Sequence, residues 1–182
     1  MPSSPNPATG YSATAKSLHW LIAALIAIQF VLVALMPDIE PDTKPTTVIN
    51  LHLSIGVVIL VATVIRLVHR LTHPVPLAMP GAPAWERLAA YTTHLVIYGI
   101  LLISPILGWA AASAHRLPVT LFGLFTLPDI AAPRAPWALE AGDIHMQLMW
   151  ALLALIAAHV AAALYHHFVR RDDVLRRMLP KH

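Results

Sequence analysis

The sequence predicts an all-α membrane protein built as a bundle of four transmembrane helices. Of its 182 residues, 58% are hydrophobic and only 12% are charged, a balance that is typical of membrane proteins. Four long apolar stretches are separated by polar or proline-rich segments, and each reaches the roughly 20 residues that cross a bilayer. The chain has no cysteine, so disulfides and every site that requires a thiolate are excluded.

The apolar stretches form one membrane domain that we expect to cover residues 15–171. Ser12 or Thr14 is expected to cap the first helix, because both side chains can accept a hydrogen bond from a free backbone N–H. Pro105 is expected to kink the third helix, because proline lacks the N–H that continues the hydrogen-bond ladder. The four expected spans cover about residues 15–36, 47–69, 85–112 and 143–169.

The segments outside the spans are expected to be tails and loops. Residues 1–14 are polar and proline-rich and lack the features of a signal peptide, so we expect a disordered tail. Residues 172–182 are expected to form a basic cytoplasmic tail. Between the third and fourth spans, the apolar run 117–130 is too short to cross a membrane. We expect it to be a short interfacial segment that lies on the outer bilayer surface.

The distribution of lysine and arginine predicts that both termini are cytoplasmic. With the N-terminus inside, nine basic residues fall on the inner side and three on the outer side, which agrees with the positive-inside rule. The inner residues are Lys16, Arg66, Arg70, Arg87, Arg170, Arg171, Arg176, Arg177 and Lys181, and the outer ones are Lys44, Arg116 and Arg134. The net charge of +3 is too small to indicate a nucleic-acid partner.

Four of the eleven histidines fall at two matching depths in the spans. His145 and His159 are 14 residues apart, so on one helix they return to within roughly 40° of one direction and lie about 21 Å apart. His52 is expected at the outer level of His145, and His19 at the inner level of His159. Each pair offers two neutral imidazoles, which suit haem iron and add no buried charge. We therefore hypothesise two haems, one near each membrane face.

Other roles for these four histidines are weaker interpretations. A single histidine on an apolar face is more often a hydrogen-bonded core residue than a ligand, although a polar side chain inside a membrane needs a reason. A metal ion without porphyrin fits poorly, because the two pairs are about 21 Å apart. Neither level has a carboxylate within a span that could complete such a site.

The sequence leaves alternatives open for the other inner histidines. His94 could contact a haem propionate, make a structural hydrogen bond or donate a proton to a quinone, and we favour these roles over ligation. His166 and His167 are expected at the inner interface, either as ordinary interfacial residues or as part of a quinone site. The histidines expected to be solvated are His69, His73, His115 and His182.

Arg66 is a second candidate for haem binding. It follows His52 by 14 residues, which puts it on the same helix face at the inner level. A charge at that depth requires an anion, and the propionates of the inner haem would accept a bidentate contact. The alternative is that the side chain extends to the lipid headgroups. Gly56, one turn after His52, would let a porphyrin approach the backbone.

Several motifs resemble the prokaryotic cytochrome b(561) family over nearly the whole chain. They are SLHW in the first span, LHLSIG and VIRLVHRL in the second, THLVIY in the third, PVTLFGLFTLP in the outer loop and YHHFVRRDDVLRRMLP after the last span. The resemblance implies a multi-pass protein of the bacterial inner membrane with two b-type haems and electron transfer to ubiquinone. The axial ligands of the family map onto His19, His52, His145 and His159.

Some members of this family oxidise superoxide at the outer face and pass the electrons through two haems to ubiquinone. The resemblance therefore implies an oxidoreductase of this kind. The alternative is an electron-carrier cytochrome b subunit that links a hydrogenase or dehydrogenase to the quinone pool, and a third reading is a haem-free transporter or structural membrane protein. The oligomeric state is left open.

The outer side complicates the superoxide hypothesis, because its acids outnumber its three bases. Those acids are Asp38, Glu40, Asp42, Asp129, Glu140 and Asp143. An anion would be repelled by that face as a whole, so any attraction must be local. We expect local attraction around Arg116, His115 and Arg134, with at least one of the two arginines lining the superoxide entry.

Overall fold

Four long helices dominate the computed structural model, which describes residues 10–40, 43–74, 76, 81 and 83–179. Each helix is long and apolar enough to cross a membrane, which confirms the predicted four-span architecture. The fourth helix continues into a π-helical turn, η1, and a short 3-10 helix, η2, follows near the C-terminus. The helices are α1 (Ala13–Leu35), α2 (Thr47–Thr72), α3 (Ala84–Ala114), α4 (Pro136–Tyr165), η1 (His166–Arg170) and η2 (Arg176–Met178).

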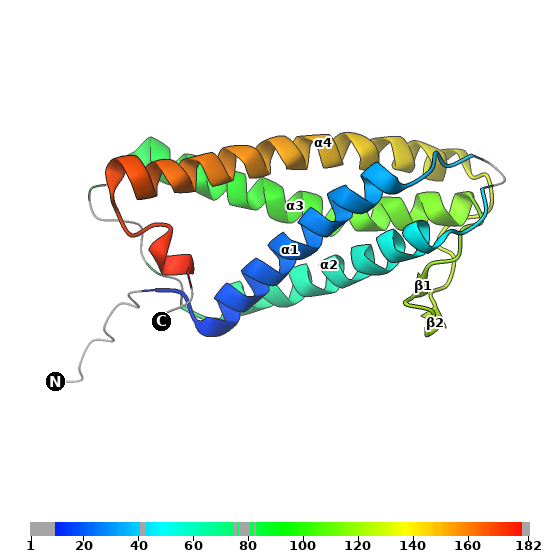
Figure 1. Ribbon diagram of the computed structural model, residues 1–182, viewed down its shortest axis with the longest axis horizontal. Helices are drawn as coiled ribbons and strands as arrows, with labels where there is room; N and C mark the ends of the chain where they lie inside the picture. The colour runs from blue at the N-terminus through cyan, green and yellow to red at the C-terminus, as the bar shows by residue number, and fades with distance from the viewer. Residues whose placement is uncertain (1–9, 41–42, 75, 77–80, 82, 180–182) are drawn as a thin grey trace.

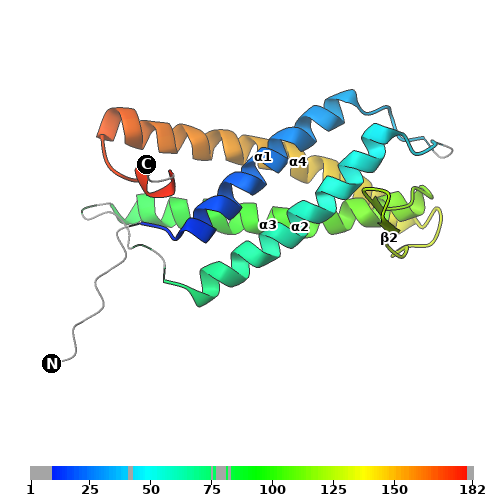
Figure 2. The same cartoon turned by 60° about the horizontal axis from the view of Figure 1, so that its bottom comes forward.

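The helices pack as two pairs that cross each other. α3 and α4 run side by side along the long axis, whereas α1 and α2 form a second pair that lies at an angle to them (Figure 1, Figure 2). A cluster of apolar side chains from all four helices fills the middle of the bundle. Its members include Ile22 of α1, Ile59 of α2, Ile100 of α3 and Leu152 of α4. This core holds the two ends of the bundle at fixed positions.

Local sequence signals explain where the helices begin. The hydroxyl of Ser12 accepts a hydrogen bond from the N–H of Ala15 at 3.2 Å, so Ser12 caps α1 as one of the two predicted residues. Thr46 caps α2 in the same way, accepting from the N–H of Ile49 at 3.3 Å. α3 continues through Pro105 as one helix.

The last long helix begins at Pro136, earlier than the predicted start at residue 143. Proline fits the first turn of a helix, where its missing N–H would have no partner. The added turns pack through small residues, because Ala138 and Ala141 are buried against Ala110 and Ala114 of α3. Apolarity alone did not reveal these turns, because tight packing here depends on small size rather than on a long apolar run.

The loop between α3 and α4, named the outer loop after the predicted orientation, also contains a short β-hairpin. Outer and inner denote the two membrane faces of that predicted orientation. Strands β1 (Thr120–Leu121) and β2 (Phe125–Thr126) pair antiparallel. Phe122, Gly123 and Leu124 connect the strands, and the N–H of Leu124 donates to the carbonyl of Leu121 at 2.9 Å. Phe122 and Gly123 at the centre of this turn have φ values of 48° and 76°, the left-handed pair that tight hairpin turns require. The hydroxyl of Ser54 accepts from the N–H of Phe122 at 3.0 Å, which ties the hairpin to α2. Its position on the bilayer surface stays a prediction.

The C-terminal segment folds back against the start of α1 (Figure 2). Arg171 adopts a left-handed conformation with φ 55°, which reverses the chain after η1. Lys16 then donates to the carbonyl of Leu179 at 2.7 Å, and the indole of Trp20 donates to the carbonyl of Met178 at 2.9 Å. The segment is therefore a packed element rather than a free tail. Of the disordered tail predicted for residues 1–14, residues 1–9 lie outside the described residues, whereas Ala13 and Thr14 already belong to α1 and Ser12 caps it.

Candidate functional site

The structure brings both predicted histidine pairs together. The ring centroids of His52 on α2 and His145 on α4 are 6.2 Å apart, with the ring planes at 88°. The centroids of His19 on α1 and His159 on α4 are 6.3 Å apart, with the planes at 72°. Each pair therefore joins one helix of the α1–α2 pair to α4, and the two separations are nearly equal.

These separations fit two imidazoles bound to one iron. A metal–nitrogen bond of about 2 Å on each side places the centroids of two opposite imidazole rings about 6 Å apart. Both pairs meet this requirement. Among the described residues, no three histidine or acidic side chains are grouped so that they could hold a bare metal ion.

His145 has a defined hydrogen-bond partner on α3. Its Nδ1 lies 2.8 Å from the carbonyl oxygen and 2.8 Å from the hydroxyl oxygen of Ser104, which is fully buried. A Cβ added to Gly108 would lie 3.2 Å from the Cε1 and Nδ1 atoms of His145. The ring thus lies directly against the α3 backbone, in a space that Gly108 leaves open.

The surroundings of His52 differ from those of His145. Its Nδ1 is buried and has no hydrogen-bond partner among the described residues. The side-chain amide of Gln29 on α1 donates to the backbone carbonyl of His52 at 3.0 Å. A Cβ on Gly56 would lie 3.6 Å from that same amide nitrogen, so Gln29 is the neighbour of Gly56 in the structure. Gln29 therefore fixes α1 against α2 at the outer level.

A third imidazole joins the inner pair. The ring of His94 on α3 lies 5.2 Å from that of His159, with the planes at 76°. Its Nδ1–H donates to the carbonyl of Ala90 at 2.6 Å, since a carbonyl oxygen can only accept. The ring of His94 is thus closer to His159 than the ring of His19 is. This separation of 5.2 Å is also shorter than the 6.2 Å and 6.3 Å of the two predicted ligand pairs.

Arg66 lies at the inner pair, as expected from its spacing. Its guanidinium donates a hydrogen bond to the carbonyl of Ala15 at the start of α1. Its charge is close enough to act on both His19 and His94. This arrangement supplies a cation beside the inner histidines that could hold a carboxylate group.

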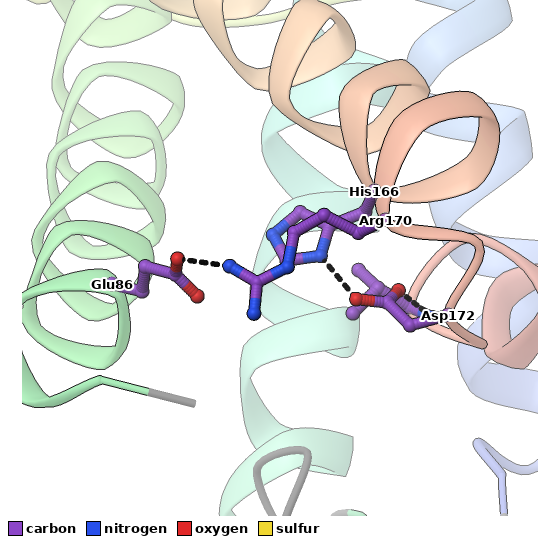
Figure 3. Close-up of polar contacts among 5 residues, drawn as sticks. Glu86, His166, Arg170 and Asp172 are labelled. Carbon is purple, nitrogen blue, oxygen red and sulfur yellow. Dashed lines mark hydrogen bonds and ion pairs between the residues drawn. The ribbon is translucent and has the colours of Figure 1, made fainter. Parts of the chain in front are cut away.

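Two ionic contacts close the inner end of α4 (Figure 3). His166 bonds through Nδ1 to Asp172 at 2.6 Å, and Arg170 forms an ion pair with Glu86 of α3. Burial raises the pKa of Asp172, but the hydrogen bonds from His166 and the N–H of Val174 outweigh it and leave this pKa below its ordinary value. The carboxylate therefore stays charged at neutral pH.

The histidines proposed for a quinone site make separate contacts. His94 is beside His159, and His166 is bonded to Asp172. His167 packs edge-on against Phe168, with the ring centroids 4.8 Å apart.

At the outer end, Arg116 and Arg134 line one pocket together with His115. The N–H of Arg134 donates to the carbonyl of Ala114 at 2.9 Å, which ties the end of the outer loop to the end of α3. Both arginine side chains are exposed. The two bases predicted to act together are therefore neighbours in space, although 17 residues separate them in the chain.

Several site residues were missed from the sequence. Ser104, Gln29 and Asp172 each contact a functional candidate, and Glu86 pairs with Arg170. Asp172 lies within the motif that follows the last span, whereas Ser104, Gln29 and Glu86 lie outside all of the motifs. One signal was available: Ser104 and Gly108 are four residues apart and so share one face of the third helix.

A family model described as prokaryotic cytochrome b561 matches residues 10–181. The chain belongs to the prokaryotic cytochrome b561 family. The resemblance carried by its motifs is thereby confirmed. Membership of this family implies membrane electron transfer with b-type haem, and the four spans identify a multi-pass protein of the bacterial inner membrane.

Three curated relatives are similar to parts of this chain. Cytochrome b561 homolog 2 of Escherichia coli (strain K12) is 37% identical over 108 residues, which cover 59% of this chain and 57% of the relative. Cytochrome b561 homolog 1 of the same organism is 33% identical over 58% of this chain and 60% of the relative. A probable superoxide oxidase CybB of Yersinia pestis is 33% identical over 50% of this chain and 52% of the relative. The chain thus spans between about half and three fifths of the length of these relatives.

Proposed function

We propose that this cytochrome binds two b-type haems, one between His52 and His145 and one between His19 and His159. The observation that carries the proposal is the near-equal ring separation of 6.2 Å and 6.3 Å, because both values fit an iron with an imidazole on each side. Two axial histidines leave no open position on the iron. The protein residues would therefore support electron transfer rather than binding of a ligand at the metal.

His94 is assigned a role beside the inner haem rather than on its iron. Its ring separation of 5.2 Å from His159 is too short for two imidazoles on opposite sides of one iron. Arg66, whose charge acts on His19 and His94, is the proposed partner of a haem propionate. The Nδ1 proton of His94 is donated to Ala90, so His94 would contact the second propionate or supply a proton to a quinone through a second proton carried on Nε2.

We propose that superoxide is the electron donor at the outer face and ubiquinone the acceptor at the inner face. Two superoxide anions give two electrons and two O2 molecules, and two protons taken up at the inner side complete the ubiquinol. The pocket lined by Arg116, Arg134 and His115 supports this direction, because it offers local positive charge on a face that is acidic overall. Charges farther away matter less, since screening limits their reach to about 8 Å at physiological salt.

The inner end is proposed to supply protons to the quinone. His94, His166 and His167 are the candidate groups, because imidazoles exchange protons near neutral pH. His166 is supported by its bond to Asp172, which fixes the orientation of its ring. The alternative function, an electron-carrier subunit for a hydrogenase or dehydrogenase, predicts a stable partner enzyme and no turnover with superoxide alone.

The test begins with a dithionite-reduced spectrum and quantification of haem in the purified protein, where we expect two low-spin b haems per chain. Superoxide added with ubiquinone should then reduce the haems and yield ubiquinol. In an Arg116→Ala/Arg134→Ala variant, haem reduction by superoxide should be roughly 10-fold slower at low salt, and the difference should shrink as salt rises.

The matched control is Lys44→Ala, which removes the third outer base without touching the pocket. Equal rates and salt slopes in the double variant and the control would show that the arginines do not steer the anion. One haem per chain would contradict the four-ligand assignment. No reduction by superoxide in the unmodified protein would favour the carrier function.

A further inference from the structure

Ser104 and Gly108 form a cradle for one ligand histidine, His145. Both oxygen atoms of Ser104 lie 2.8 Å from the Nδ1 atom of His145, and Ser104 itself is fully buried. One turn further along α3, a Cβ on Gly108 would approach two ring atoms to 3.2 Å. The ring is therefore held by hydrogen bonding at one position and by close packing at the next.

The carbonyl contact decides which ring nitrogen carries the proton. A carbonyl oxygen has no hydrogen to donate, so Nδ1 of His145 must be the donor in this bond. The other ring nitrogen, Nε2, then carries the free lone pair that a metal requires. The hydroxyl of Ser104 contacts the same Nδ1, so it is a second acceptor for that proton.

The other three proposed ligands have no such support. In the part of the chain that the structure describes, no hydrogen bond holds the ring of His19, His52 or His159, and Nδ1 of His52 is buried without a partner. An imidazole that donates its second N–H to an oxygen is a stronger electron donor to a metal. A stronger donor stabilises the oxidised iron and lowers its reduction potential.

We propose that Ser104 is a positioning residue that holds His145 as the Nδ1–H tautomer and makes the outer haem harder to reduce than the inner one. This inference rests on the proposed ligation by His145. The consequence would be directional. An electron from the donor would reduce the outer haem, and its transfer to the inner haem, which has the higher potential, would return the outer haem to its oxidised state. The difference between the two ends is thus built into α3.

The test is a redox titration of the haem-loaded Ser104→Ala variant. The backbone carbonyl of residue 104 remains, so both haems should stay bound. Loss of one neutral acceptor should shift the equilibrium between the haems roughly 2- to 10-fold toward a reduced outer haem, with the inner potential unchanged. The matched control is Ser113→Ala, which removes another buried hydroxyl of α3 that contacts only Trp109 and Ile130.

A second variant tests the packing side of the cradle. Gly108→Ala should displace the His145 ring and alter the electron paramagnetic resonance signal of the outer haem alone. Gly142→Ala is the control, because its Cβ would crowd Ala111 to the same 3.2 Å at the α3–α4 interface without meeting His145.

Two results would overturn the positioning role. One is an outer potential that is unchanged in Ser104→Ala while both haems remain bound. The other is a Gly108→Ala spectrum identical to that of Gly142→Ala. Failure of the proposed ligation is detected by a different variant. An outer haem that persists in His145→Ala would show that His145 is not a ligand at all.

Discussion

The two ends of the bundle hold similar histidine pairs in different surroundings. At the outer end, His145 is fixed by Ser104 and by the close approach of Gly108, and small residues pack α3 tightly against α4. At the inner end, the His19–His159 pair has a third imidazole and an arginine beside it. The outer pair is thus held by close packing and hydrogen bonds, whereas the inner pair has a basic residue and a further imidazole beside it.

This difference agrees with the two halves of the proposed reaction. Oxidation of superoxide releases only an electron, so the outer end needs a fixed haem and no proton donor. Quinone reduction consumes protons, so the inner end needs proton donors, and the proposed candidates there include His94 and His166. In the proposed reaction, one fold would separate electron entry from proton uptake across the membrane.

The largest expected effects come from removing one ligand at a time. His159→Ala should remove the inner haem or convert it to high spin while the outer haem remains, and His52→Ala should do the reverse. Each variant removes one of the two imidazoles that are proposed to hold that haem. Absorption spectra and haem quantification of the purified variants measure the result.

His94→Ala is the discriminating companion to these ligand variants. We expect it to keep both haems, because His94 is too close to His159 to share its iron from the opposite side. If His94→Ala loses a haem and His159→Ala does not, the assignment of His19 and His159 as the inner ligands is wrong, and so is the comparison of the two ends that rests on it.

The pairing of the histidines at the two ends could be predicted from the sequence. The 14-residue spacing and the depth of each histidine predicted which residues meet, and the structure brings His52 to His145 and His19 to His159. Depth works as a predictor because a membrane span is a straight helix of known rise, so position in the chain converts directly into height.

Other features depend on contacts that the regular spacing of residues along a helix does not reveal. The bond between Ser104 and His145 joins residues 41 positions apart and requires the packing of α3 on α4. The hairpin at residues 120–126 depends on two left-handed residues, and Phe122 carries no turn signal of its own. The C-terminal segment is held in part through the backbone carbonyls of Met178 and Leu179. Every residue has a backbone carbonyl, so the sequence does not mark these two as hydrogen-bond acceptors.

A smaller effect is expected from the proton donors at the inner end. Substitution of His94 or His166 by alanine should slow oxidation of pre-reduced haem by ubiquinone by up to about 100-fold, while both haem spectra stay intact. His73→Ala is the control, since it removes an exposed histidine of the same side with no proposed role. Stopped-flow absorption measures the rates, and unchanged kinetics in variants of His94, His166 and His167 would exclude all three.

The smallest expected effect concerns the pH dependence of the contact between Asp172 and His166 (Figure 3). The pKa of Asp172 is lowered in the folded protein, because the bonds from His166 and Val174 and the charges of His166 and Arg170 outweigh its burial. A carboxyl whose pKa falls on folding stabilises the folded state above its unfolded pKa of about 3.9, and that contribution is lost as the pH drops through the lower folded value. The segment 172–179 should therefore keep its protection from hydrogen exchange from neutral pH down to about pH 4 and lose it only below.

Asp172→Asn should lose part of this protection already at pH 7, whereas Asp173→Asn, which removes only an exposed contact with Arg176, should not. Equal exchange in the two variants would mean that other contacts, such as those of Lys16 and Trp20, hold the segment without help from the Asp172 carboxylate.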